Sequence, residues 1–248
     1  MSLTKPLASS LSGLSGINPE GGSGGGGPDF SWGDYPGLLI RFDMSVNSAN
    51  HMTVVNSLVT SVTDQTGNAH HAIQANTSLQ PTVSVLTGSL TGIQGNSVAF
   101  LAAGSVSFTD PRSVFIVVTA PEGATNRHFS GNASARILIL ADDRRGMHAS
   151  VQLPDGAYTA DTLELWLVEF NGATSALYAN GGAAVGSGNA GTGTSSSITL
   201  LSLVGGTQAT NGAVGEYAMF NRILATAEKN AIGLALATKW GLTWTTIT

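Results

Sequence analysis

Two pairs of carboxylates are the first candidates for chemistry in this chain. Glu164 and Glu169 stand five residues apart, and Asp142 and Asp143 are adjacent. A glycosidase needs two carboxyl groups that face one another across the sugar, about 5.5 Å apart for retention or about 6.5 to 9.5 Å for inversion. Successive side chains of a strand point to opposite faces, so neither pair is expected to meet on one face. We therefore expect no catalytic residues and no enzyme.

A sugar-binding site is the second candidate. Such a site combines apolar or aromatic side chains with a few well-placed polar groups. Tyr158 is expected to be its exposed ring because it follows a predicted turn, with Asp155 and Asp161 nearby. Arg144 and Arg145 are expected to lie in a solvated loop that could contact acidic sugars. These five residues form the predicted carbohydrate-binding site.

Other residue types that often do chemistry stand in unfavourable patterns. His70 and His71 are adjacent and are expected to project to opposite sides of a surface turn, so no metal site is predicted. Glu216 has apolar neighbours and is expected to be a structural acid that satisfies backbone donors or pairs with Arg222. Trp166 lies in a predicted strand and is expected in the core.

The composition excludes several classes of partner. The 248 residues carry a net charge of -5, only 10% of them are charged, and a duplex-binding surface needs clustered cations, so nucleic acid is not expected. Zero cysteines exclude disulfides and thiolate zinc sites. The apolar runs are too short for a membrane helix, and the start lacks the apolar segment of a secretion signal. We therefore expect a soluble protein without a membrane partner.

The first 37 residues differ from the rest and predict an extended N-terminal arm. Leucines recur there at spacings of three or four, and residues 21–27 (GGSGGGG) form a flexible hinge. A disordered tail and an anchor that orders only against a partner both fit this pattern. The predicted anchor residues are Leu7, Leu11, Phe30, Trp32 and Tyr35.

Residues 38–248 predict one all-β domain. Short apolar or alternating segments are separated by Gly, Asn, Asp and Pro, which is typical of an antiparallel sandwich. Asn171-Gly172, Asn180-Gly181 and Asp155-Gly156 predict hairpin turns. The predicted strands are 38–42, 97–102, 113–120, 135–140, 147–152, 162–170, 175–179, 198–204 and 214–220.

A single helix is predicted near the end, from about Thr226 to Trp240. Ile232, Leu236 and Trp240 recur every four residues and form one apolar stripe. Gly241 follows where a left-handed cap is needed, and Thr226 is expected to cap the start.

The order of several segments resembles the laminin-G-like, or concanavalin A-like, lectin/glucanase family in its single-domain form. That form is common in bacteriophage virion and bacterial surface proteins. The resemblance covers about residues 38–242 and is carried by 39–43 (LIRFD), 62–74 (VTDQTGNAHHAIQ), 80–82 (QPT), 95–100 (GNSVAF), 177–181 (LYANG), 212–224 (GAVGEYAMFNRIL) and 239–242 (KWGL).

The resemblance implies a jelly-roll sandwich, but it does not imply one function. The capping serine of the family pattern is Ala225 here, which breaks a Ser-x-x-Glu capping box. Calcium-binding members supply spaced carboxylates from one rim. This chain matches no such set, so no cofactor is expected and calcium binding stays open. The Glu-x-Asp-x-Glu strand of the hydrolase members is also absent.

Together these observations predict a non-enzymatic structural protein of a bacteriophage or phage-like particle, such as a tail, fibre or head-decoration component. Its arm would dock to other virion proteins while the sandwich projects outward and binds host-surface polysaccharide. Such a protein would be located in the virion. A bacterial carbohydrate-binding or adhesion module is the alternative, and a glycoside hydrolase is the third reading. No heptad repeat indicates an oligomer, so a homo-oligomer stays open.

Overall fold

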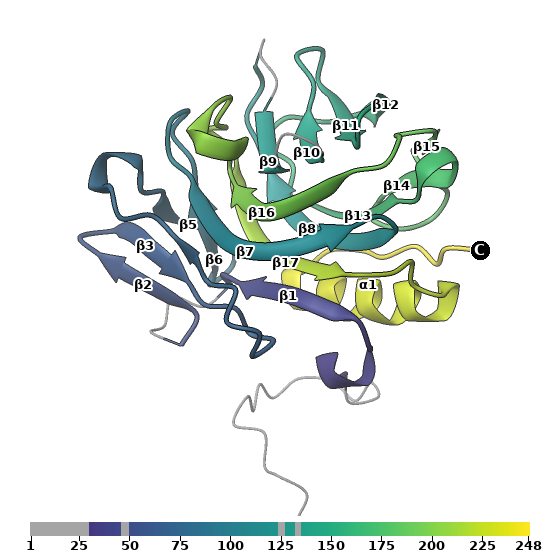
Figure 1. Ribbon diagram of the computed structural model, residues 1–248, viewed down its shortest axis with the longest axis horizontal. Coiled ribbons are helices and arrows are strands. Elements are labelled where there is room, and N and C mark those ends of the chain that lie inside the picture. Colours follow the sequence, from purple (N-terminus) through teal and green to yellow (C-terminus); the bar gives the residue numbers. More distant parts are fainter. Residues whose placement is uncertain (1–29, 46–49, 124–126, 132–134) are drawn as a thin grey trace, which may run out of the picture.

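The structure is a computed structural model that describes residues 30–45, 50–123, 127–131 and 135–248. Leu7 and Leu11 lie outside these residues. Strands dominate the described chain, with one α-helix and four short 3-10 helices (Figure 1). The strands are β1 (Leu38–Asp43), β2 (Met52–Val55), β3 (Leu58–Val62), β4 (Ala72–Ile73), β5 (Thr82–Thr87), β6 (Leu90–Gln94), β7 (Leu101–Thr109), β8 (Arg112–Thr119), β9 (Arg127–Gly131), β10 (Arg136–Ile139), β11 (Arg144–His148), β12 (Gln152–Ala157), β13 (Glu164–Phe170), β14 (Ser175–Ala179), β15 (Gly186–Gly188), β16 (Thr194–Leu200) and β17 (Ala213–Phe220). The helix α1 is Thr226–Trp240, and the 3-10 helices are Trp32–Asp34, Thr77–Leu79, Gly172–Thr174 and Val204–Gly206.

Hydrogen bonds join all the strands into one antiparallel sheet that nearly closes on itself. One half runs β1-β17-β8-β13-β14-β15, and the other runs β4-β7-β16-β9-β10-β11-β12. Strands β5 and β6 continue the first half from one end of β17, and β2 and β3 continue the second half from β4. The all-β class and the C-terminal helix predicted from the sequence are confirmed.

The central strands are buried on both faces, which explains their nearly unbroken apolar sequence. In β8, Val114, Ile116 and Val118 point into the main core between the two halves of the sheet. Their neighbours Phe115 and Val117 point to a second core on the outer face. The helix α1 lies along this outer face, next to β17 and β1 in Figure 1.

The helix has the bounds that its apolar stripe predicts. Ile232, Leu236 and Trp240 are all buried in the second core, and Gly241 takes the left-handed conformation with φ 66°. The expectation that Thr226 caps the helix is wrong, because Ala225 occupies the N-cap position. The backbone N–H of Ala225 donates to the Glu228 carboxylate at 2.8 Å, which is the half of a capping box that needs no side chain at the N-cap.

Several local predictions of strands and turns are wrong. The predicted strand 147–152 is interrupted by the turn between β11 and β12, where Ser150 takes a positive φ of 77°. Asp155-Gly156 lies inside β12 rather than in a turn. The predicted strand 97–102 begins only at Leu101. The predicted ranges contain none of the strands β2 to β6, β9 and β15, which are short or carry Thr, Ser and Gly among their apolar residues.

Candidate functional site

The rim formed by β11, β12 and the start of β13 brings Arg145 against Glu164. The guanidinium donates to both carboxylate oxygens, with Nε to Oε2 at 2.8 Å and Nη2 to Oε1 at 2.5 Å. Its Nη1 donates to the Ala157 carbonyl, and the Trp166 indole donates to Glu164 Oε2 at 2.6 Å. Bidentate pairs of this kind are strong and geometrically specific. Arg145 therefore has a structural role, because its guanidinium is held in a bidentate pair with Glu164.

Tyr158 lies beneath this rim, so the expectation that its ring is exposed is wrong. Its side chain is 5% exposed and meets Trp166 edge-to-face, with ring centroids 6.2 Å apart. The hydroxyl accepts the Ala120 N–H at 2.8 Å and donates to the Thr162 carbonyl at 2.8 Å. Burial raises the pKa of this hydroxyl. The ring closes one end of the main core and is not a surface for stacking a sugar.

The remaining predicted rim residues are placed differently. Arg144 is 44% exposed in its side chain and pairs with Asp142 at 2.6 Å. Asp161 is exposed and takes a positive φ of 58°. The backbone of Asp155 lies in β12, opposite Arg145. The rim thus offers Arg144, Asp142 and Asp161 to solvent, and it contributes no exposed aromatic ring among the described residues.

A second charged cluster connects β1, β17 and α1. Asp43 and Glu216 face one another across the two strands, and both are almost fully buried. Arg41 bridges them through Asp43 Oδ2 at 2.8 Å and Glu216 Oε1 at 3.0 Å. Lys239 Nζ also bridges them, at 2.8 Å from Asp43 Oδ2 and 2.7 Å from Glu216 Oε2. The Trp240 indole donates to Glu216 Oε2 at 3.0 Å. Every carboxylate oxygen of Glu216 therefore has a donor.

The electrostatics of this cluster favour an ionised Asp43. Burial alone would raise the pKa of Asp43, but Lys239 and Arg41 lower it, together with hydrogen bonds from Lys239 and Ser45. The resulting pKa is about 2. The oxygens of both carboxylates are occupied by contacts with Arg41 and Lys239 inside the domain. The structural interpretation of Glu216 therefore holds, although its partners are Arg41 and Lys239.

Arg222, the partner expected for Glu216, pairs with Glu228 instead. Its Nη1 and Nη2 each reach one oxygen of the Glu228 carboxylate at 2.7 Å. Arg222 Nε donates to the Pro36 carbonyl at 2.8 Å, which joins the segment before β1 to the start of α1. This arrangement corrects the expected pairing.

The candidate catalytic carboxylates point away from one another, as predicted. Glu164 faces the main core beside Trp166, whereas Glu169 faces the helix side and pairs with Lys229 at 2.7 Å. Asp143 pairs with Arg127 at the rim. The buried Asp43, Glu164, Glu169 and Glu216 thus each carry a basic partner. Buried Asp64 instead accepts backbone N–H groups and the Thr66 hydroxyl. These contacts favour structural roles over general acid–base chemistry.

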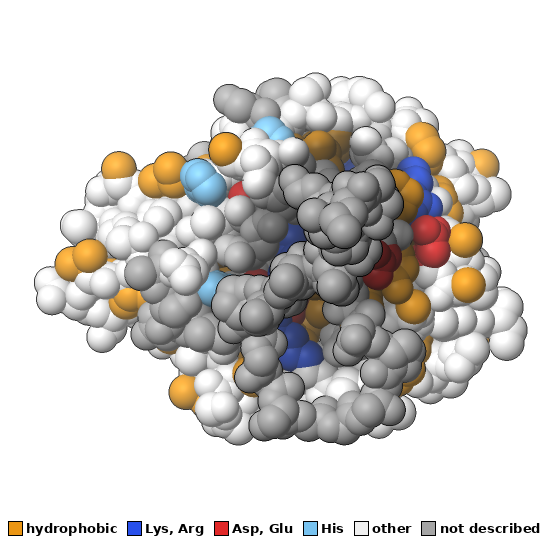
Figure 2. Space-filling view, turned by 90° about the horizontal axis from the view of Figure 1, so that it is seen from below, with side chains coloured by type: hydrophobic (Ala, Val, Ile, Leu, Met, Phe, Trp, Pro, Cys, Tyr) orange, Lys and Arg blue, Asp and Glu red, His pale blue; other side chains and the backbone are white. Residues whose placement is uncertain are grey.

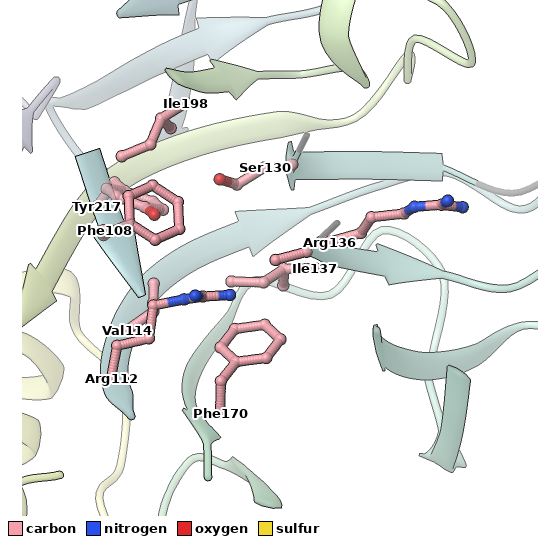
Figure 3. A pocket seen from close by; sticks show the side chains of 11 residues that line it. Phe108, Arg112, Val114, Ser130, Arg136, Ile137, Phe170, Ile198 and Tyr217 are labelled. Carbon is pink, nitrogen blue, oxygen red and sulfur yellow. The ribbon is translucent and has the colours of Figure 1, made fainter. Parts of the chain in front are cut away.

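A small cavity opens between the two halves of the sheet (Figure 3). Its polar wall is the guanidinium of Arg112, which lies between the rings of Phe108 and Phe170 at 4.6 and 4.1 Å from their centroids. Arg112 pairs with Asp110 at 2.5 Å. The other residues that line the cavity are Val114, Ser130, Gly131, Ala135, Arg136, Ile137, Ile198 and Tyr217. The enclosed space fits about one water molecule, which is too little for a sugar.

The three aromatic residues predicted as anchors pack on the domain itself. Phe30, Trp32 and Tyr35 flank the second core, and Trp32 stacks against Phe220 with centroids 6.4 Å apart. All three side chains are partly exposed. These contacts hold the three rings against the domain, and their role as anchors to a virion stays a prediction.

The described histidines do not assemble a metal site. His71 accepts the Asp64 backbone N–H through Nδ1 at 3.1 Å, while the backbone of His70 donates to Asp64 Oδ2. Across the described ranges, no group of three or more His, Asp or Glu side chains could hold a metal ion. No described helix is long and apolar enough to cross a membrane.

Comparison with known proteins identifies similar folds. No protein-family profile and no curated protein sequence matches the chain. The binding domain of Paraclostridial Mosquitocidal Protein 1 is similar, with a TM-score of 0.61, 12% identity, and 83% of this chain aligned to 55% of that one. Trypanosoma rangeli sialidase bound to 2,3-difluoro-KDN gives a TM-score of 0.57 and 14% identity, with 84% of this chain aligned to 34% of the sialidase.

Domain 4 of AbnA is similar over most of its own length. AbnA is a GH43 extracellular arabinanase from Geobacillus stearothermophilus, and that domain was solved in complex with arabinotriose. The TM-score is 0.52 at 14% identity, and 74% of this chain aligns to 91% of that domain. The fold thus belongs to a class of all-β domains that occurs in a sialidase chain, a toxin binding domain and an arabinanase domain.

Proposed function

We propose that this protein is a non-catalytic carbohydrate-binding domain. The observation that carries the proposal is the shared fold with AbnA domain 4, which covers nearly all of that arabinotriose-bound domain. The binding domain of the mosquitocidal protein has the same fold. A carbohydrate-binding module was the alternative hypothesis from the sequence, and these two similar structures favour it over a virion protein.

The arrangement of carboxylates supports binding rather than hydrolysis. Asp43 and Glu216 are bridged by Arg41 and Lys239, and Glu164 is clamped by Arg145. A retaining or inverting glycosidase needs two carboxyl groups free to act on opposite sides of one bond. The likeness to the sialidase covers only 34% of that chain, so its activity is not carried over to this protein.

Within this proposal we assign the fold to the laminin-G-like or concanavalin A-like sandwiches. Two of the family-like motifs have a structural purpose that supports the assignment. Asp64 of the 62–74 turn accepts the backbone N–H groups of Arg41, Thr66 and His70. The 212–224 and 239–242 segments meet where Glu216 accepts from Lys239 and Trp240.

The predicted virion role rests on the sequence of the arm and stays a prediction, as does location in a virion. The division into an arm of residues 1–37 and a domain of residues 38–248 is also a proposal. The contacts of Trp32 with Phe220 and of Arg222 with Pro36 support moving the start of the domain to Phe30.

The proposal is tested by polysaccharide retention combined with an assay for hydrolysis. The full chain is incubated with arabinan, arabinoxylan, cellulose, polysialic acid and bacterial lipopolysaccharide, and bound protein and new reducing ends are both measured. We expect retention by at least one polysaccharide and no new reducing ends. Retention by none contradicts the binding function. Release of reducing ends that is lost in Glu164→Gln or Glu169→Gln establishes a glycosidase instead.

A further inference from the structure

We propose that Phe30, Trp32 and Tyr35 form a stacking platform for a neutral oligosaccharide. This inference rests on the proposed carbohydrate-binding function and names the surface that performs it. The sequence predicted these rings as anchors to another protein, and the predicted sugar site lay on the β11–β12 rim. The described structure favours the opposite assignment.

The three rings form one continuous aromatic cluster. Phe30 lies between the other two, edge-to-face with Trp32 at a centroid distance of 5.1 Å and stacked on Tyr35 at 5.5 Å. Each side chain is partly buried and partly exposed. Tyr and Trp rings offer an apolar face together with a polar tip, a combination that suits the C–H face and the hydroxyls of a sugar.

The cluster is held rigidly by the domain. Trp32 stacks on Phe220 of β17 and carries the Arg41 guanidinium 4.7 Å from its ring centroid. The 3-10 helix Trp32–Asp34 lies beside β1 at the lower side of the molecule in Figure 1. Arg222 Nε holds the Pro36 carbonyl at 2.8 Å, directly after Tyr35. Because the rings are already fixed, a ligand would not have to order them, which favours binding.

The charges around the platform favour a neutral ligand. Arg41 is neutralised by Asp43 and Glu216, and Arg222 is neutralised by Glu228. Asp34 adds an exposed carboxylate within the same 3-10 helix, which disfavours sialic or uronic acids. Figure 2 shows the lower face of the molecule, where acidic and basic side chains lie near one another outside the grey atoms. Hydrogen bonds to uncharged hydroxyls are the polar contacts that such a surface suits.

Other parts of the described chain suit a sugar less well. At the β11–β12 rim, Tyr158 is buried and Arg145 is committed to Glu164. The cavity beside Arg112 fits about one water molecule. The strongly exposed aliphatic side chains, which would suit an apolar protein partner, lie outside the platform at Val55, Ile73, Val85, Val98, Val151, Val185 and Leu234.

The platform is tested by aromatic substitutions in the full chain. Tyr35→Ser and Phe30→Ser remove one ring each, and Trp32→Ala removes the ring that also packs on Phe220. The probe is arabinan or cellulose, whichever retains the wild-type protein, with affinity measured by depletion from solution. We expect each variant to bind at least tenfold more weakly. Thermal unfolding identifies any variant that has lost its fold, and Trp32→Phe should recover part of the affinity.

Arg144→Ala is the control, because it removes an exposed polar group from the rim and leaves the platform intact. We expect it to bind like the wild type. If the folded Tyr35→Ser and Phe30→Ser variants bind like the wild type while Arg144→Ala does not, the platform is wrong and the rim is the site. Binding only to polysialic acid by the wild type also contradicts a neutral ligand. If the wild type binds no polysaccharide, the proposed function itself fails.

Discussion

Individual charged residues in this protein act mainly as clamps between distant segments. Lys239 of α1 reaches Asp43 of β1 across 196 residues of sequence, and Arg41 reaches Glu216 across 175. Two carboxylates buried side by side repel one another unless cations lie between them. Arg41 and Lys239 therefore lie between these carboxylates where the first strand, the last strand and the helix meet.

Lys239→Met tests this clamp. The substitution keeps the aliphatic stem but leaves Asp43 and Glu216 with Arg41 as their shared cation, so one buried carboxylate loses its compensation. We expect the free energy of unfolding to fall by about 3 kcal/mol in chemical denaturation. Arg144→Met, which breaks the exposed pair with Asp142, should leave stability unchanged. Equal stability of both variants and the wild type would show that the clamp contributes nothing.

His128 gives the folded state a specific pH dependence. Burial, together with the nearby Arg136, lowers its pKa from 6.5 to about 4. The unfolded chain therefore binds a proton that the folded chain refuses, so stability falls as the pH drops from about 6.5 towards 4. We expect a loss of about 2 kcal/mol between pH 7 and pH 5.

The measurement is chemical denaturation at both pH values for the wild type and for His128→Gln. The variant cannot take up the proton, so its stability should change less over this range. Asp43 adds a separate loss only as the pH falls from 3.8 to about 2, because its folded pKa is the lower one. An identical pH slope in the variant would assign the dependence to other groups.

At the scale of elements, the helix α1 is positioned by close contacts rather than by its own propensity. Gly215 of β17 lies under Trp240, where a Cβ would approach the indole to 2.4 Å. Gly233 lies under Trp244. The indole of Trp244 is tilted by 51° against the ring of Phe115 and donates to Asn230 Oδ1 at 3.1 Å. Two glycines thus let two indoles lie flat against the helix and the sheet.

Gly233→Ala tests this packing. At an exposed position inside a helix, replacing Gly by Ala would raise the free energy of unfolding by roughly 1 kcal/mol. Here the new Cβ would lie 2.2 Å from Trp244, which must move. We expect a net destabilisation of about 2 kcal/mol, measured by thermal or chemical unfolding. Leu234→Ala, on the exposed face one residue later, should change stability little. A stabilised Gly233→Ala variant would contradict the close contact.

Local patterns explain which elements could be predicted from the sequence. Ile232, Leu236 and Trp240 recur every four residues and predict a helix, and Gly241 correctly marks its C-terminal end. Asp155-Gly156 shows the limit: the pair has the composition of a turn, but pairing with β11 extends it into a strand. Tyr158 was expected to be exposed because it follows this predicted turn.

The candidate site depended on contacts that no local pattern contains. Trp32 packs on Phe220 and under Arg41, and these residues are brought together only when β1 pairs with β17. The aromatic composition of residues 30–35 did single them out, but their orientation towards their own domain had no sequence signal. The motif containing Lys239 and Trp240 signalled a structural role without naming Asp43 as the partner.

At the scale of the whole molecule, one nearly closed sheet encloses the main core and carries the helix on its outer face. The buried Glu164, Glu169 and Glu216 are held by basic partners, so the proposed binding function relies on surface contacts. A preformed surface of this kind is what the proposed function requires.

The most direct test of this account is a glycan-array measurement on the full chain, with calcium and with a chelator. We predict saturable binding to neutral glycans, and a loss of binding with the chelator would assign part of the site to a metal ion. Absence of saturable binding to every glycan, in a protein shown to be folded, would contradict the carbohydrate-binding function.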